Sequence, residues 1–413
     1  MVKLSRQTNF KNHYFMPQVN SEIEAFARIR VVGIGGSGKN AVNHMVESKV
    51  RGVDFVVVNT DAQDLHHSLA KKKIHIGKNL TRGLGAGANP DLGRRAAEET
   101  KEEIQQAMKG SDMVFIACGM GGGTGTGAAP VVAKTAKELG ALTVAVVTKP
   151  FSFEGQQRLR MAEAGLEELR KEVDALIVIP NDRILATVAK DTTLKAAFAL
   201  CDDILKQAVE GISDLITHPG IINVDFADIR AVMENAGSAL MGIGIASGEN
   251  RAAVAAKAAV SSPLLELSIN GAKGVLFAIA GGDDLGMVEV HEAAKIITES
   301  VDPNAKIIFG AIKDDKLKKN DVRVTVIATG FPAAGVTPRG TPLFNFARDS
   351  KEKEPDVAPI GKIFNTPVAP IKEKEEEPRK TVAPEPEVKP RKEEDEDDEW
   401  GAVPSFLRRP KIK

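Results

Sequence analysis

The stretch Val114–Val132 reads V-F-I-A-C-G-M-G-G-G-T-G-T-G-A-A-P-V-V and joins a predicted strand to a predicted helix. The apolar run Met113–Cys118 has the length and β-branched character of a buried strand. Pro130 and the apolar residues after it indicate an amphipathic helix with the proline in its first turn. The segment between strand and helix contains Gly119, Gly121, Gly122, Gly123, Gly125, Gly127, Thr124 and Thr126.

A loop so rich in glycine indicates that a ligand approaches the backbone closely, because an ordered glycine loses more backbone freedom than any other residue. A row of N–H groups at the start of a helix suits an anion, and the threonine hydroxyls add donors. The simpler alternative is a flexible surface loop, but a strand and a helix flank this one directly. We therefore predict that this loop binds phosphate.

Strands and helices alternate on both sides of this loop as far as residue 179. The predicted strands are apolar along their whole length, which is typical of an α/β fold with a parallel sheet covered on both faces. Ligands of such sheets bind at the carboxyl ends of the strands. Besides 113–118, the predicted strands are 29–34, 53–58, 73–76, 142–147 and 175–179.

The pattern changes after this region to one long amphipathic helix, Thr193–Thr217, followed by the loop 221–228. The remainder to 331 predicts a smaller α+β domain with strands at 240–246, 275–280, 306–311 and 322–329 and helices at 249–260 and 286–300. The predicted organisation is an N-terminal extension (1–28), a nucleotide-binding α/β domain (29–192), a central helix (193–220), an α+β domain (221–331), a disordered linker (332–398) and a docking peptide (399–413).

The docking peptide is predicted because apolar anchors return after the charged, proline-rich linker. Trp400, the single tryptophan of the chain, comes six residues before Phe406 and Leu407. A frayed terminus would not need these three side chains together, whereas short anchors on disordered tethers are a common recognition mode. Ser21–Glu24 has the pattern of a capping box for a short helix in the extension.

Composition excludes several other classes of protein. The 413 residues carry a net charge of −1, which gives no electrostatic footprint for nucleic acid. The two cysteines, Cys118 and Cys201, stand alone and fit a reducing cytosol. The histidine spacing predicts no resident metal site. No segment has the pattern of a signal peptide or the length of a membrane span.

The first glycine loop, Gly33–Asn40, is ambiguous by itself. Gly33-x-Gly35-x-x-Gly38 satisfies the dinucleotide fingerprint of an NAD(P)-dependent oxidoreductase, with Asn59 and Asp61 near the spacing of a ribose-binding acid. The same loop is one residue short of a P-loop. Two glycine-rich loops after strands favour a nucleoside triphosphate, and a non-catalytic nucleotide-binding scaffold stays open as a further alternative.

Two groups of polar residues follow the later strands. Glu154 and Arg158 are either a surface ion pair one helical turn apart or ligands of a ribose and phosphate. Asp225 is a natural N-cap and Asp228 favours the helix dipole, but capping alone does not explain why Asn223 stands with them.

Taken together, these motifs resemble the FtsZ family, the tubulin-like GTPases of bacterial cell division. The matching segments are G-G-G-T-G-T-G (121–127), N-V-D-F-A-D (223–228), N-T-D-A-Q (59–63), G-L-G-A-G-A-N-P (83–90), P-F-S-F-E-G (150–155), I-P-N-D (179–182) and the terminal W-G-A-V-P-S-F-L-R-R. The resemblance covers 29–331 continuously. Ser37 and Lys39 depart from it, since that loop is close to pure glycine in the family.

The resemblance implies a site for GTP or GDP, with Mg2+ accompanying the nucleotide. It implies that Glu154, Arg158 and Asn181 meet the ribose, that Phe198 stacks on the base and that Asp203 selects guanine. Asn223, Asp225 and Asp228 are implied as the catalytic group that positions water. The implied phosphate ligands are Gly36, Ser37, Gly38, Lys39, Asn40, Gly87, Ala88, Gly122, Gly123, Thr124, Gly125, Thr126 and Gly127.

Helix geometry predicts catalysis between two subunits. About fourteen helical residues, roughly 21 Å, separate Asp203 from the acidic loop. If Asp203 holds the base, as the resemblance implies, the acids would reach only a neighbour's nucleotide. Such a head-to-tail contact generates filaments. The implied partners are the chain itself and division proteins, including an FtsA-like membrane anchor that binds residues 400–413. The implied location is the cytoplasm at the division site.

Overall fold

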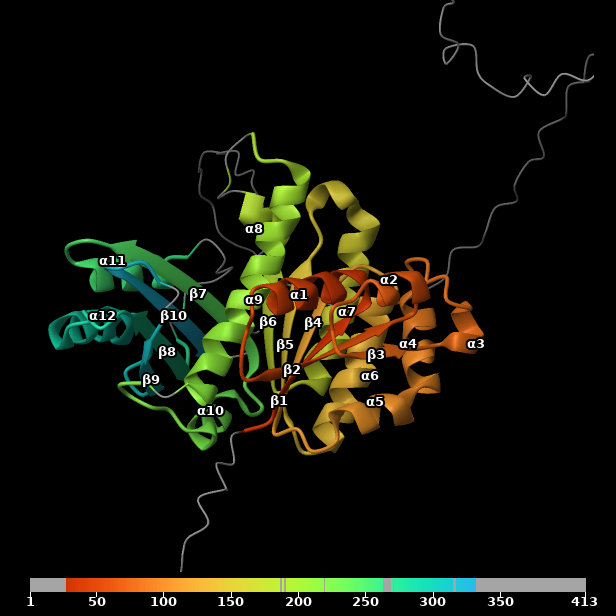
Figure 1. The fold of residues 1–413 in the computed structure, drawn as a ribbon, viewed down its shortest axis with the longest axis horizontal. Helices are drawn as coiled ribbons and strands as arrows, with labels where there is room; N and C mark the ends of the chain where they lie inside the picture. The colour runs from red at the N-terminus through yellow and green to blue at the C-terminus, as the bar shows by residue number, and fades with distance from the viewer. Residues whose placement is uncertain are drawn as a thin grey trace, which may run out of the picture. The chain divides into compact units, whose positions relative to one another are not determined.

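The computed structural model describes residues 27–331, apart from residues 186, 187, 189, 190, 219, 263–268, 270, 315 and 316. A ten-stranded sheet of strand order β3-β2-β1-β4-β5-β6-β7-β10-β8-β9 runs through the described chain (Figure 1). The predicted capping box, linker and docking peptide lie outside the described residues. The predicted domain boundaries stay predictions.

The first six strands confirm the predicted parallel sheet. They are β1 (Ile29–Ile34), β2 (Val53–Asn59), β3 (Lys72–His75), β4 (Met113–Gly119), β5 (Leu142–Lys149) and β6 (Ala175–Pro180). Each pairs in parallel with its neighbours in the sheet. The strand order reverses between β1 and β4, and such a switch point opens a crevice at the carboxyl ends of the strands.

Helices cover both faces of this parallel half, which is why its strands are apolar at nearly every position. Val31 and Phe115 pack into one core with α1 (Gly35–Glu47) and α9 (Leu194–Thr217). Val32 and Ile116 face the opposite core, which is covered by α4 (Pro90–Glu99), α5 (Lys101–Met108), α6 (Thr124–Glu138) and α7 (Gln156–Glu172). Shorter elements are α2 (Ala62–His66), α3 (Lys78–Thr81), η1 (Ser152–Glu154) and α8 (Asn181–Leu185).

The chain between Pro90 and Met108 forms two helices, because the backbone of Thr100 leaves the helical region and separates α4 from α5. The predicted place of Pro130 in the first turn of its helix needs correction, because that helix begins at Thr124 and the proline lies inside it. The N–H of Gly127 donates to the carbonyl of Gly123, so the glycines themselves form the first turn.

The second half confirms the predicted α+β arrangement. Strand β10 (Asp321–Thr329) pairs antiparallel with β7 (Gly237–Ser247) and with β8 (Gly274–Gly281), and β8 pairs in parallel with β9 (Lys306–Lys313). Helices α11 (Arg251–Val260) and α12 (Met287–Glu299) pack on one face. Apolar residues of α9 and of β8 belong to one core, so α9 lies between the two halves (Figure 1). The short helix α10 (Phe226–Met233) follows α9.

Candidate nucleotide site

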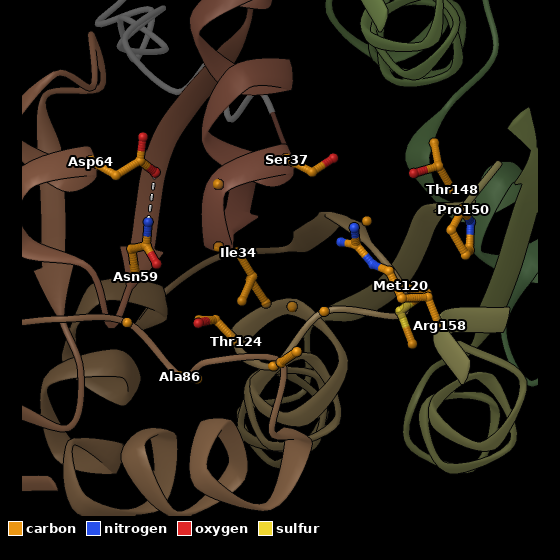
Figure 2. Close-up of a pocket in the computed structure, with 18 of the residues that line it drawn as sticks. Ile34, Ser37, Asn59, Asp64, Ala86, Met120, Thr124, Thr148, Pro150 and Arg158 are labelled. Atoms are coloured by element: carbon orange, nitrogen blue, oxygen red, sulfur yellow. Dashed lines mark hydrogen bonds between the residues drawn. The ribbon is translucent and has the colours of Figure 1, made fainter. Parts of the chain in front are cut away.

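A cavity of about 530 Å³ opens at the carboxyl ends of the parallel strands. Residues at the carboxyl ends of four strands line it: Ile34, Asn59, Gly119 and Thr148. In Figure 2, Asn59 and Asp64 lie on one side of the cavity, Thr148 and Arg158 lie on the other, and Thr124 lies between them. The volume is in the range of small-molecule and cofactor sites. The predicted crevice at the switch point is therefore present.

The second glycine loop brings bare backbone to the cavity. A methyl group on Gly122 would meet no atom within 4 Å, so this residue borders open space. A methyl on Gly125 would lie 2.6 Å from the carbonyl oxygen of Gly119, so the tight turn itself requires glycine there. Thr124, also in the lining, shares a 2.6 Å hydrogen bond between its Oγ1 and Oγ1 of Thr60. The N-terminus of α6 therefore presents N–H donors to an anion.

Two residues predicted to bind phosphate support the second loop without lining the cavity. Thr126 is buried, and its Oγ1 accepts a 2.8 Å hydrogen bond from the N–H of Gly121. A methyl on Gly127 would lie 1.9 Å from the carbonyl oxygen of Pro90, so Gly127 allows α6 to pack on α4. Packing contacts therefore account for the identities of Thr126 and Gly127, and their predicted contact with phosphate stays a prediction.

The first glycine loop also contains some residues that line the cavity and others that do not. Gly36 and Ser37 are exposed and line the cavity. Gly38 is buried, and a methyl there would lie 2.3 Å from the carbonyl oxygen of Ala117 in β4. Lys39 is turned away from the lining into an ion pair, and Asn40 is exposed on α1 outside the lining. The predicted phosphate contacts of Gly38, Lys39 and Asn40 therefore have no support from their positions.

A third segment, residues 85–88, completes this wall. Gly87 and Ala88 both have positive φ angles, 56° and 57°. Glycine adopts that backbone freely, but for an alanine it is strained. A methyl on Gly87 would meet no atom within 4 Å, so the segment borders open space, as the prediction for Gly87 and Ala88 required.

The opposite wall carries the three predicted ribose ligands. Arg158 Nη1 lies 2.6 Å from Glu154 Oε2, and Glu154 Oε1 accepts a 3.0 Å hydrogen bond from the N–H of Phe151. Asn181 is buried at the start of α8, and within the described residues its Oδ1 has no hydrogen-bond partner. Because buried polar atoms are nearly always satisfied, this unpaired oxygen indicates that the cavity receives a ligand with a hydrogen-bond donor.

The aromatic residue predicted to stack on a base is well placed. Phe198 lines the cavity from α9, is 42% exposed and packs edge-on against buried Phe151, with ring centroids 5.3 Å apart. A partly exposed ring held from behind by a buried one offers a free face to a planar ligand.

The aspartate predicted beside it, Asp203, is not among the residues that line the cavity, whereas its neighbour Asp202 is. Asp203 pairs instead with Lys206 Nζ (2.6 Å) and with His44 Nε2 of α1 (3.3 Å).

The two aspartates also differ in acidity. Burial raises the pKa of Asp202 to about 6, although the positive charges of His44 and Lys39 act against this. Burial also acts to raise the pKa of Asp203, but hydrogen bonds and the charge of Lys206 outweigh it and leave that pKa below its ordinary value. Asp203 is thus a fixed carboxylate in an ion-pair cluster, whereas Asp202 faces the cavity and titrates near neutrality.

The predicted catalytic residues lie apart from the cavity. Asn223, Asp225 and Asp228 are exposed and are not part of its lining. Asn223 Oδ1 accepts from the N–H of Gly220 (2.6 Å), and Asp225 Oδ1 accepts from the N–H of Asp228 (2.7 Å), so Asp225 is the N-cap of α10. In Figure 1, α10 and α8 lie at opposite ends of α9.

Several lining residues were not among the predicted ligands. Asn59 ends β2, Thr60, Asp61 and Asp64 follow it, and Thr148 lies near the end of β5. Their position at the carboxyl ends of predicted strands could have identified them. Met120, Cys201 and Leu205 also line the cavity, and their apolar character gave no such signal.

Other classes of site find little support in the described part of the chain. No group of three or more histidine, cysteine or acidic side chains there is arranged to hold a metal ion. Cys118 and Cys201 are buried free thiols, and burial raises the pKa of each to about 12. Within residues 27–331 as described, no helix meets the length and apolarity needed to span a bilayer.

Comparison with known proteins gives one family for both halves. The Tubulin/FtsZ family GTPase domain matches residues 28–189, and the FtsZ family C-terminal domain matches residues 237–332. A solved structure described as an empty FtsZ dimer from M. jannaschii is 50% identical, covers 74% of this chain and 88% of that chain, and has a TM-score of 0.71. CetZ1 from Haloferax volcanii, described as a GDP-bound monomer, is 24% identical over 75% of this chain and 96% of its own, with a TM-score of 0.65, and shares the fold.

These matches leave the oxidoreductase and the non-catalytic scaffold without support. They also explain the cavity, because glycine-lined backbone at helix N-termini is what a nucleotide's phosphates require. The chain is 50% identical to an FtsZ structure over 74% of its own length and has a nucleotide-sized cavity at the switch point of its sheet. It therefore belongs to the FtsZ family and is a tubulin-like GTPase that binds guanine nucleotides.

Proposed function

We propose that the protein polymerises head-to-tail with GTP into the filaments of the cell-division ring and hydrolyses the GTP at each junction between subunits. The observation that carries this proposal is the separation of the cavity from Asp225 and Asp228 along α9. Thr217, the end of α9, comes fifteen residues after Asp202, and at 1.5 Å per residue this separation is about 22 Å. The acids of one chain therefore serve the nucleotide of the next.

Exposed apolar side chains support a contact between these two ends. Leu84, Phe153 and Leu194 are exposed beside or one turn from residues that line the cavity. Ile221 is exposed next to the acidic loop, and its N–H donates to the carbonyl of Ala311 in β9. Ile307 and Phe309 of the same edge strand are also exposed. Two different apolar surfaces at opposite ends suit a heterologous contact, which repeats into a filament.

The residues of this chain divide the chemistry between them. Backbone N–H groups of the glycine loops bind the phosphates, and Phe198 stacks on the base. Asp225 and Asp228, aided by Asn223, orient and polarise the attacking water of the neighbouring site, since phosphoryl transfer depends mainly on positioning and charge. Mg2+ bound with the triphosphate would supply charge neutralisation, held chiefly by phosphate oxygens and water, as is usual for this ion.

We assign guanine selection to Asp202. A carboxylate accepts hydrogen bonds from the N1–H and the amino group of guanine, whereas adenine has an unprotonated ring nitrogen at that position. A site that leaves buried polar groups unpaired discriminates strongly against the wrong base. Asp202 lines the cavity one turn of α9 from Phe198, so one helix face would read both the ring and its edge.

The junction proposal is tested by mixing two inactive variants. Asp225→Asn/Asp228→Asn keeps the caps but removes the charges, so it should bind GTP without hydrolysing it. A methyl on Gly122 meets no atom within 4 Å, so Gly122→Glu should be accommodated by the backbone and extend into the cavity, whereas a methyl on Gly123 would lie 2.8 Å from Asn89 N. Each variant alone should release almost no phosphate, and the mixture should recover part of the wild-type rate. Gly122→Ala is the matched control.

Recovery should be incomplete, because junctions between identical variants stay inactive. Wild-type activity per subunit should also fall on dilution. A mixture that releases no more phosphate than its parts, with wild-type activity independent of concentration, would show that the acids act within their own chain.

We further propose that residues 400–413 bind an FtsA-like membrane anchor and so bring the filaments to the division site from the cytoplasm. The support is the return of Trp400, Phe406 and Leu407 after a long charged segment. Removing residues 400–413 should leave GTP hydrolysis intact and abolish co-sedimentation with vesicles that carry the anchor. Unchanged co-sedimentation would contradict the assignment.

A further inference from the structure

The described wall of the nucleotide cavity carries an excess of negative charge. Its charged lining residues are the carboxylates Asp61, Asp64, Glu154 and Asp202 and one cation, Arg158. Arg158 is paired with Glu154 at 2.6 Å. A nucleoside triphosphate brings several further negative charges, so the remaining carboxylates would oppose binding unless a cation offsets them.

Lys39 supplies such a cation from behind the wall. Its Nζ lies 2.6 Å from Asp64 Oδ1, and its side chain is only 11% exposed. The other oxygen of Asp64, Oδ2, accepts a 2.8 Å hydrogen bond from Asn59 Nδ2 (Figure 2). Asn59 is itself buried at the end of β2. Asp64 is therefore held from two sides, by α1 and by β2.

Asp64 lies where its charge matters to a phosphate. A methyl group built on Gly36 would come 3.6 Å from Asp64 Oδ2, so this carboxylate stands beside the exposed backbone of the first glycine loop. Asp64 lines the cavity, whereas Lys39 does not. The positive charge of Lys39 also acts on Asp202, a second carboxylate of the lining, and opposes the rise of the pKa of that group.

We propose that Lys39 is a positioning residue for the polyphosphate: it fixes Asp64 against Asn59 and cancels the negative charge of Asp64 beside Gly36, without binding a phosphate itself. The proposal rests on guanine nucleotide binding at this cavity and assigns a role to the lysine that interrupts the first glycine loop. Without Lys39, Asp64 would become an uncompensated, partly buried carboxylate facing the incoming phosphates, which is costly.

The test is a double-mutant cycle read by GTP affinity, using the full chain and a fluorescent GTP analogue under non-hydrolysing conditions. Lys39→Met should weaken binding by on the order of tenfold to hundredfold, the size of one unit charge several ångströms from a phosphate at an effective dielectric near 20. Lys39→Met/Asp64→Asn should regain most of that loss, because the repelling charge is gone. The loss should shrink as salt is raised.

Direct phosphate binding by Lys39 predicts the opposite pattern. The double variant would then bind as weakly as Lys39→Met, and Asp64→Asn alone would be the only variant to tighten binding. Either that result or an unchanged affinity of Lys39→Met would overturn the proposal. Lys101→Met, which breaks the exposed pair of Lys101 with Glu138 (3.0 Å) on α5, is the matched control and should change nothing.

Thermal unfolding of the nucleotide-free variants separates this proposal from the proposed function. Lys39→Met should lower the unfolding temperature, and adding Asp64→Asn should restore it, whether or not nucleotide binds. Wild-type protein that fails to bind the GTP analogue would contradict the proposed function. Independent, additive effects of the two substitutions on unfolding would contradict the ion pair.

Discussion

The nucleotide cavity and the acidic loop at the far end of α9 are built in contrasting ways. The cavity is assembled from the ends of several strands and helices, and its glycines are fixed by contacts such as that of Gly125 with Gly119. The acidic loop is exposed and its side chains satisfy only local N–H groups. The difference teaches that the binding cavity is assembled within one folded chain, whereas the proposed catalytic group contacts no part of that cavity.

The largest expected effect separates binding from turnover. Asp225→Asn/Asp228→Asn should lower GTP turnover by about 10²- to 10⁴-fold, the usual value of a positioned acid or base, and leave GTP affinity within about twofold. Gly122→Glu should lose both, because it fills the cavity. Phosphate release and equilibrium binding measure the two quantities. A large loss of affinity in the acidic-loop variant would show that the two regions are not independent.

The next effect sharpens the comparison within the cavity wall itself. Asp202→Asn should weaken GTP binding by on the order of tenfold to hundredfold, because a hydrogen bond to a charged group is lost, and it should reduce the preference for GTP over ATP. Asp203→Asn should retain that preference, since its partners are Lys206 and His44. Competition between GTP and ATP for a labelled nucleotide measures both. Equal effects of the two substitutions would contradict the assignment to Asp202.

A smaller effect follows from the raised pKa of Asp202, about 6. Under the proposed role, guanine binds only the ionised form of Asp202. The ratio of the wild-type GTP affinity to that of Asp202→Asn should therefore fall about tenfold between pH 7 and pH 5, where about one tenth of the group stays ionised. Taking this ratio cancels protonation of the nucleotide's phosphates. A ratio independent of pH would contradict the role of this carboxylate.

In the nucleotide-free protein, Asp202 affects folding stability, and this effect has the opposite pH dependence to its effect on GTP affinity. Its pKa is higher in the folded chain than in the unfolded one, so the folded state binds the extra proton between about pH 4 and pH 6. Its contribution to folding stability is therefore present at low pH and lost as the pH rises through that interval. Chemical denaturation of wild type and Asp202→Asn across this interval measures that sign.

Most of the fold follows from the sequence because its signals are strong and local. Apolar runs bounded by glycine loops fix the parallel strands, and the apolar stripe between Thr193 and Thr217 fixes α9. The break at Thr100 and the early start of α6 did not follow, because each depends on tertiary packing. Gly127 lies in α6 and packs closely on the carbonyl of Pro90. This contact joins two segments that are far apart in the sequence, so no local pattern reveals it.

The site was predicted well at the level of segments and less well at the level of atoms. Gly36, Gly122, Glu154 and Phe198 line the cavity as expected. Glycine spacing cannot tell a residue that approaches a ligand from one that approaches another strand, as Gly38 does. The choice between Asp202 and Asp203 depends on the rotation of α9 about its axis, which is set by packing against α1 and β5 rather than by the motif.

The placement of cavity and acids at opposite ends of α9 also fixes how active sites are counted in a filament. Under the junction proposal, a linear filament always holds one more nucleotide than it has complete active sites. At one terminus a bound GTP has no acids above it, and at the other a set of acids has no nucleotide below. The two termini are therefore chemically unlike: one keeps its triphosphate, and the share of hydrolysing subunits grows with filament length. A filament of this protein thus carries a built-in polarity of nucleotide state.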